Sequence, residues 1–71
     1  MNLTKIKPTM TPAEMVAFRG RHNLSVKGLA ALLGVTFQAV LLWESGDRRV
    51  PETTVRLLIM FEKYPDLIKE F

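Results

Sequence analysis

The sequence predicts a compact all-α domain of four to five helices. Patterns typical of β-strands are nearly absent, while residues that begin or end helices recur along the whole chain. A length of 71 residues allows one domain at most. Hydrophobic residues make up 48% of the chain, too large a share for a disordered protein.

The first predicted helix follows Thr11, whose hydroxyl can act as the N-cap. Pro12 then occupies the first helical position, where no N–H donor is needed, and Glu14 stands three residues after Thr11. This spacing is typical of a capping box. Asn23 can adopt the left-handed conformation that ends a helix. The apolar face of this helix comprises Met15, Phe18 and, as a further candidate, Val16.

The second and third predicted helices are short and close together in the chain. Ser25 caps the second helix and Gly34 ends it, while Thr36 caps the third helix (36–45) and Gly46 ends that one. The turn of about three residues between them has the spacing of a helix-turn-helix, and its glycine accepts a positive φ. The residues expected to face the core are Leu29, Leu32, Leu33, Val40 and Trp43.

A fourth helix is predicted to begin at Pro51 and Glu52 and to break at Pro65. The apolar residues that follow its start at helical spacing are Val55, Leu58 and Ile59. The predicted organisation is a flexible basic arm (1–10), a helix-turn-helix domain (11–64) and a C-terminal helical segment (65–71).

The charge of the chain is basic and unevenly distributed. The net charge is +3, and residues 1–56 hold eight basic against four acidic residues, a net charge of +4. A basic body favours polyanions such as nucleic acid, although solubility alone could also explain it. There is no cysteine, no bilayer-length apolar run and no apolar signal core at the start. These features predict a cytoplasmic protein without a membrane partner.

Residues 11–64 resemble the phage-repressor/Cro-like family, also called the XRE family. The resemblance is carried by Leu24, Ser25, Leu29, Ala30, Leu32, Leu33, Gly34, Val35, Val40, Trp43, Glu44, Gly46, Pro51, Leu57 and Leu58. It implies a lambda-repressor-like fold and a homodimeric, sequence-specific DNA-binding regulator of transcription, acting as a repressor or autorepressor. It also implies a partly buried structural salt bridge between Arg19 and Glu44. Val26 and Gly28 depart from the family pattern, which removes one expected phosphate contact and introduces a weak helix former.

The same resemblance places the third helix in the major groove of DNA. The residues that it would present to base edges are Phe37, Gln38, Leu41 and Leu42. Gln38 can pair with adenine, and the three apolar side chains can pack on thymine methyl groups, which predicts a palindromic operator with A·T-leaning half-sites. Phe37 and Leu41 could instead complete the core against the fourth helix or a partner subunit.

Backbone and subunit contacts are expected from other parts of the chain. The predicted DNA phosphate contacts are Ser25, Lys27, Arg48 and Arg49, with Lys5 and Lys7 of the arm as further candidates. The predicted dimer contacts are Leu67, Ile68 and Phe71, which could alternatively fold back onto their own core.

Neither an enzyme nor a cofactor or metal site is expected. The chain has no cysteine, a single histidine (His22) and no glycine-rich phosphate loop. The alternative function is an antitoxin or adaptor whose apolar third helix binds a partner protein. A DNA reader should bind its own operator with a steep salt dependence, whereas an adaptor should bind DNA only weakly and without sequence preference.

Overall fold

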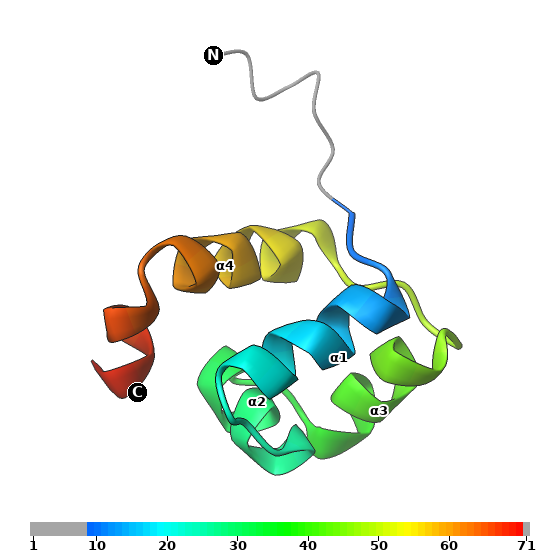
Figure 1. Ribbon diagram of the computed structural model, residues 1–71. Helices are drawn as coiled ribbons and strands as arrows, with labels where there is room; N and C mark the ends of the chain where they lie inside the picture. The colour runs from blue at the N-terminus through cyan, green and yellow to red at the C-terminus, as the bar shows by residue number, and fades with distance from the viewer. Residues whose placement is uncertain (1–8, 71) are drawn as a thin grey trace.

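The computed structural model describes residues 9–70, which form four α-helices and one 3₁₀ helix (Figure 1). These elements are α1 (Pro12–Arg21), α2 (Val26–Leu33), α3 (Phe37–Ser45), α4 (Glu52–Lys63) and the 3₁₀ helix η1 (Pro65–Glu70). No strand occurs within the described range. The predicted all-α class of four to five helices is therefore confirmed, while most of the predicted arm, with Lys5 and Lys7, lies outside the described residues.

Side-chain caps fix the starts of the first three helices. Thr11 accepts a hydrogen bond from the Glu14 N–H (3.1 Å), and the Glu14 carboxylate accepts one from the Thr11 N–H (3.0 Å). These N–H and hydroxyl contacts lower the pKa of Glu14. Ser25 and Thr36 likewise accept hydrogen bonds from the third residues of α2 and α3. The capping box and both predicted N-caps are thus formed.

The turn between α2 and α3 sets the angle between these helices. Gly34 ends α2 with φ = 70°, and the chain direction changes by 113° before α3 begins. Three residues separate the two helices. This turn length and the 113° angle both fall in the range typical of a helix-turn-helix. Asn23 and Gly46 also take positive φ values, 54° and 85°, at the predicted helix ends.

All four α-helices contribute to one core. In Figure 1, α1 lies between α4 on one side and the α2–α3 pair on the other. The buried residues are Met15, Phe18, Leu29, Ala30, Val40, Trp43, Val50, Val55, Leu58 and Phe61. Leu32 and Leu33 are only half-buried at its margin. α1 therefore contributes Met15 and Phe18 to a core that it shares with helices on both of its sides.

Two apolar residues that the sequence spacing predicted on core-facing sides of their helices are exposed instead. Val16 is 44% exposed and Ile59 is 50% exposed, whereas Phe61 is buried. α4 buries residues at three-residue intervals (Val55, Leu58 and Phe61), which turns its core face toward Phe61 and away from Ile59. Burying the larger aromatic ring removes more apolar surface from water.

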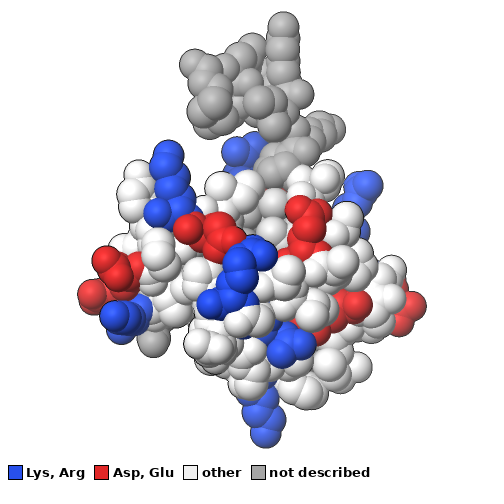
Figure 2. Space-filling model, in the orientation of Figure 1, with Lys and Arg blue, Asp and Glu red and all other residues white. Residues whose placement is uncertain are grey.

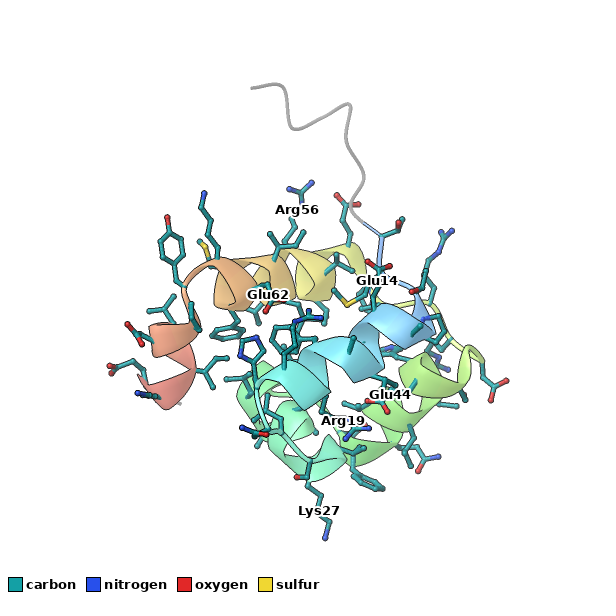
Figure 3. All side chains as sticks on the ribbon, in the orientation of Figure 1. Glu14, Arg19, Lys27, Glu44, Arg56 and Glu62 are labelled. Atoms are coloured by element: carbon teal, nitrogen blue, oxygen red, sulfur yellow. The ribbon has the colours of Figure 1, made fainter. Side chains whose placement is uncertain are left out.

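A charged cluster connects the end of α1 to α4. Glu62 receives a contact from Arg21 and a hydrogen-bond contact of 2.5 Å from His22 Nε2. The His22 contact is the main cause that lowers the pKa of Glu62, and Arg21 adds to it. The His22 ring also packs against Phe18, with 4.5 Å between ring centroids. Figure 3 shows Glu62 on the side of α4 that faces α1.

Replacing Gly20 with alanine should stabilise the fold. Gly20 is an exposed residue of α1, and an added Cβ would meet nothing within 4 Å. Because alanine is the better helix former, G20A should raise the free energy of unfolding by about 0.5–1 kcal/mol in urea titrations. Gly34 offers a matched control, since it has equal space but a φ of +70°, so G34A should lower stability. Equal effects of the two substitutions would contradict this account.

The Glu62 cluster should make stability depend on acid pH. Because the pKa of Glu62 lies below its ordinary value of 4.5, its contribution is complete above that pH and is lost as pH falls through the lowered pKa. E62Q should therefore be less stable near neutral pH, and its free energy of unfolding should fall less between neutral pH and about pH 3. Urea titrations across this range measure both quantities, and parallel curves for the two proteins would refute the expectation.

Candidate nucleic-acid interface

The outer face of α3 is apolar and accessible. Phe37 is 43% exposed and Leu41 is 38% exposed, while Val40 and Trp43 on the opposite side are buried. Neither Phe37 nor Leu41 is among the buried residues of the core. Gln38 lies in the same turn and is also exposed. Three of the four predicted base-reading residues thus share one accessible face.

Leu42 is the exception among the predicted base-reading residues. Its side chain is half-buried, although the sequence placed it outward with the others. The loop after α3 folds back toward this position, where the Arg48 N–H donates to the Leu42 carbonyl (3.1 Å). The Ser45 hydroxyl donates to the same carbonyl (3.1 Å). Leu42 therefore presents less surface than Phe37 or Leu41.

Gln38 is the one exposed polar side chain of α3 that makes no hydrogen bond to another residue in the range 9–70. The Ser45 hydroxyl is already engaged by the Leu42 carbonyl and by Asp47, at 2.9 Å. Glu44 is held by Arg19. The hydrogen-bonding capacity of this face therefore comes almost entirely from one amide, which can donate two bonds and accept two.

The predicted pair between Arg19 and Glu44 is formed and is bidentate. Arg19 Nε lies 2.8 Å from Glu44 Oε2, and Arg19 Nη2 lies 3.0 Å from Oε1. Arg19 Nη1 also donates to the Leu24 carbonyl (3.4 Å) in the connection between α1 and α2. The bonds to Glu44 raise the pKa of Arg19. Figure 3 shows both side chains in the space between α1 and α3.

The cations of the domain fall into two groups, those with and those without a carboxylate partner. The paired cations are Arg19, Arg21 and Arg56. Exposed cations without an ion pair to any described residue are Lys27, Arg48, Arg49, Lys63 and Lys69. The first three are the predicted phosphate contacts, and they lie in α2 and in the loop after α3. Figure 2 shows basic and acidic side chains interspersed on one face, and Figure 3 shows Lys27 pointing away from the helices.

Ser25, the fourth predicted phosphate contact, has its oxygen in use as a cap. Its Oγ accepts from the Gly28 N–H at 2.9 Å. The hydroxyl hydrogen remains a donor, since a serine hydroxyl can donate one bond while accepting others. Ser25 is exposed at the start of α2, one residue after Leu24. The Ser25 hydroxyl can thus donate a hydrogen bond to an acceptor outside the protein, from a position two residues before Lys27.

The predicted dimer contacts differ in how much surface they offer. Leu67 is 40% exposed, Ile68 is half-buried against the core of its own chain, and Phe71 lies outside the described residues. Further exposed apolar side chains on and after α4 are Leu57, Ile59, Met60 and Tyr64. Leu57 and Met60 are three residues apart in α4, which places them on one flank of the helix, and Tyr64 directly follows the helix. Tyr64 was not among the predicted contacts, because its position beside Pro65 indicates only where the helix ends.

No protein-family model matches this chain, and no curated protein matches it. No single helix in the described range is long and apolar enough to span a membrane. The resemblance to the phage-repressor/Cro-like family therefore remains a prediction from the residues quoted for it.

Loss of the Arg19 guanidinium should destabilise the fold because it leaves the Glu44 carboxylate, only 12% exposed, without its partner. We expect R19M to lower the free energy of unfolding by about 1.5–3 kcal/mol. R56M is the matched control, since Arg56 pairs with Glu52 within one exposed helix turn and should contribute less than about 0.5 kcal/mol. R19M/E44Q should recover part of the loss by removing the unpaired charge. Equal losses for R19M and R56M in urea titrations would contradict a structural role for the pair.

Proposed function

We propose that this chain is a sequence-specific DNA-binding regulator of transcription of the phage-repressor/Cro type. In this proposal α3 enters the major groove, and the protein acts in the cytoplasm as a dimeric repressor of its own or another gene. The observation that carries the proposal is the accessible face of α3, which follows a 113° turn and has unpaired cations in the segments before and after it. This arrangement suits a helix that meets base edges while its neighbours meet phosphates.

The phosphate contacts in the proposal are Lys27, Arg48 and Arg49, together with the Ser25 hydroxyl. A cation that already has a carboxylate partner gains less from a phosphate, so the lack of a partner favours these residues over Arg19, Arg21 and Arg56. Contacts of this kind give affinity and salt dependence, and they orient the protein without specifying sequence.

Sequence preference in the proposal comes from α3. Gln38 makes bidentate hydrogen bonds to an adenine, and Phe37 and Leu41 pack on thymine methyl groups. Leu42 contributes less because it is half-buried. The expected target is therefore an A·T-leaning half-site.

A dimer accounts for the length of site that such a protein needs. The longest extent of the domain is 34 Å, which is about one turn of B-DNA, so one protomer covers a single half-site. The exposed apolar side chains Leu57, Met60, Tyr64 and Leu67 offer a surface for a second copy. A two-fold pair would place two α3 helices on a palindromic operator.

Fluorescence anisotropy tests the proposal with DNA from upstream of the protein's own gene and a scrambled duplex, each across a range of salt concentrations. Specific binding is expected for the first duplex. Replacing both Arg48 and Arg49 with glutamine removes two phosphate contacts from each protomer, so it should make the slope of log affinity against log salt less steep by about 4 for the dimer. R56Q is the control, because Arg56 already pairs with Glu52 (2.9 Å) and should leave the slope unchanged. Q38A should relax the preference at one base pair.

Equal and weak binding to both duplexes would overturn the proposal. The exposed face of α3 would then fit the alternative of an antitoxin or adaptor, in which Phe37 and Leu41 bind a partner protein. An affinity for the upstream duplex that Q38A leaves unchanged at every base pair would refute the assigned role of Gln38 alone.

A further inference from the structure

The accessible face of α3 carries two apolar side chains, one amide and no free charge. Phe37 and Leu41 are four positions apart and therefore lie on adjacent turns, with Gln38 beside them. The carboxylate of Glu44 is neutralised by Arg19, and the Ser45 hydroxyl is bonded within its own chain. No lysine or arginine lies within α3. The usual bidentate contact from arginine or lysine to guanine is therefore absent from this helix.

The major groove offers such a face one kind of apolar target. The edges of the base pairs present hydrogen-bond donors and acceptors, and the exception is the methyl group on C5 of thymine. We infer that α3 recognises the C5-methyl group of pyrimidines, so that 5-methylcytosine can take the place of thymine in its target. This inference rests on the proposed function, and it names the chemical group that the same surface reads.

Thymine and 5-methylcytosine carry the same methyl group on the same ring carbon. They differ at C4, where thymine has an oxygen acceptor and cytosine has an amino donor. Phe37 and Leu41 have no group that can form a hydrogen bond with either, so they respond to the methyl group and not to the atom on C4. Only Gln38 can distinguish the two bases, and only at the base pair that it contacts. Methylation of a cytosine at a position that Phe37 or Leu41 contacts should therefore strengthen binding.

The charges in the segments before and after α3 favour DNA over an apolar protein groove as the occupant of this face. Lys27 lies at the start of α2, and Arg48 and Arg49 follow α3, so exposed cations without carboxylate partners among the described residues stand on both sides of the face along the chain. A polyanionic duplex gains from all three, whereas a neutral protein groove gains from none. The pairing of Glu44 with Arg19 removes the one carboxylate of α3 that would repel phosphates.

The test uses the duplex that the protein binds best and changes only its methyl groups. Deoxyuridine in place of thymidine removes the C5-methyl group and keeps the base pair. We expect each methyl group lost from contact with Phe37 or Leu41 to weaken binding about fourfold in fluorescence anisotropy. At the same positions, a 5-methylcytosine·guanine pair should bind about fourfold more tightly than an unmethylated cytosine·guanine pair. Both comparisons use the unchanged protein.

Three protein variants assign the effect to α3. F37A and L41A should each lose the affinity ratio between thymine and uracil duplexes at the position that the deleted side chain contacts. L57A is the matched control, because Leu57 is the same residue type with the same exposed fraction of 38% but lies on α4. It should retain both methyl ratios even if it weakens dimerisation. Circular dichroism melting checks that each variant is folded.

The possible outcomes separate the inference from the proposed function. Specific binding with equal affinity for thymine and uracil duplexes would overturn the inference and leave the proposed function standing. Equal affinity for cytosine and 5-methylcytosine duplexes would also overturn the inference alone. The same holds if F37A and L41A leave the affinity ratio between methylated and unmethylated duplexes unchanged. Failure to prefer any duplex over a scrambled one would overturn the proposed function and the inference together.

Discussion

The guanidinium of Arg19 joins three parts of the chain that would otherwise be held mainly by apolar packing. Two of its nitrogens bind the carboxylate of Glu44 in α3, and a third binds the Leu24 carbonyl between α1 and α2. A planar, bidentate pair has a narrow range of favourable geometries, so it fixes orientation as well as distance. Partly buried ion pairs add little net stability compared with apolar groups of similar size. The main contribution of this pair is therefore the orientation of α3 relative to α1.

This orientation decides which side of α3 faces solvent. With Glu44 tied to Arg19, and with Val40 and Trp43 in the core, the helix cannot rotate without breaking both the pair and the packing. Phe37, Gln38 and Leu41 are left outward as a consequence. The apolar character of this face is thus a fixed property of the fold, and binding need not first rearrange the helix.

Local signals in the sequence were sufficient for the helix boundaries and insufficient for some helix faces. Caps depend on side chains and backbone groups within three or four residues, so Thr11, Ser25 and Thr36 could be read directly. The face of α4 could not, because residues 57–61 are apolar without interruption and every rotation of the helix buries some of them. Ile59 was assigned for its spacing, whereas Phe61 is buried.

The candidate site shows the same division between local and tertiary information. The family pattern predicted which residues of α3 face outward, and it predicted the Arg19–Glu44 pair. Three of the four predicted outward residues are exposed, and the pair is formed. Which cations have partners could not be predicted from spacing, because Arg21 and His22 meet Glu62 across about 40 residues of chain. Leu42 could not be placed either, since the half-burial of its side chain depends on tertiary packing and not on its spacing within α3.

Trp43 gives α3 an optical property. It is the single tryptophan of the chain and is 4% exposed, and its indole N–H has no hydrogen-bond partner in the range 9–70. Buried indole groups usually find such a partner. The emission of an indole moves to longer wavelength when water or a polar group reaches it. The emission of Trp43 in the folded protein should therefore lie at short wavelength. Any event that loosens the core packing around Trp43 will therefore produce a red shift in intrinsic fluorescence, which can be measured without a label.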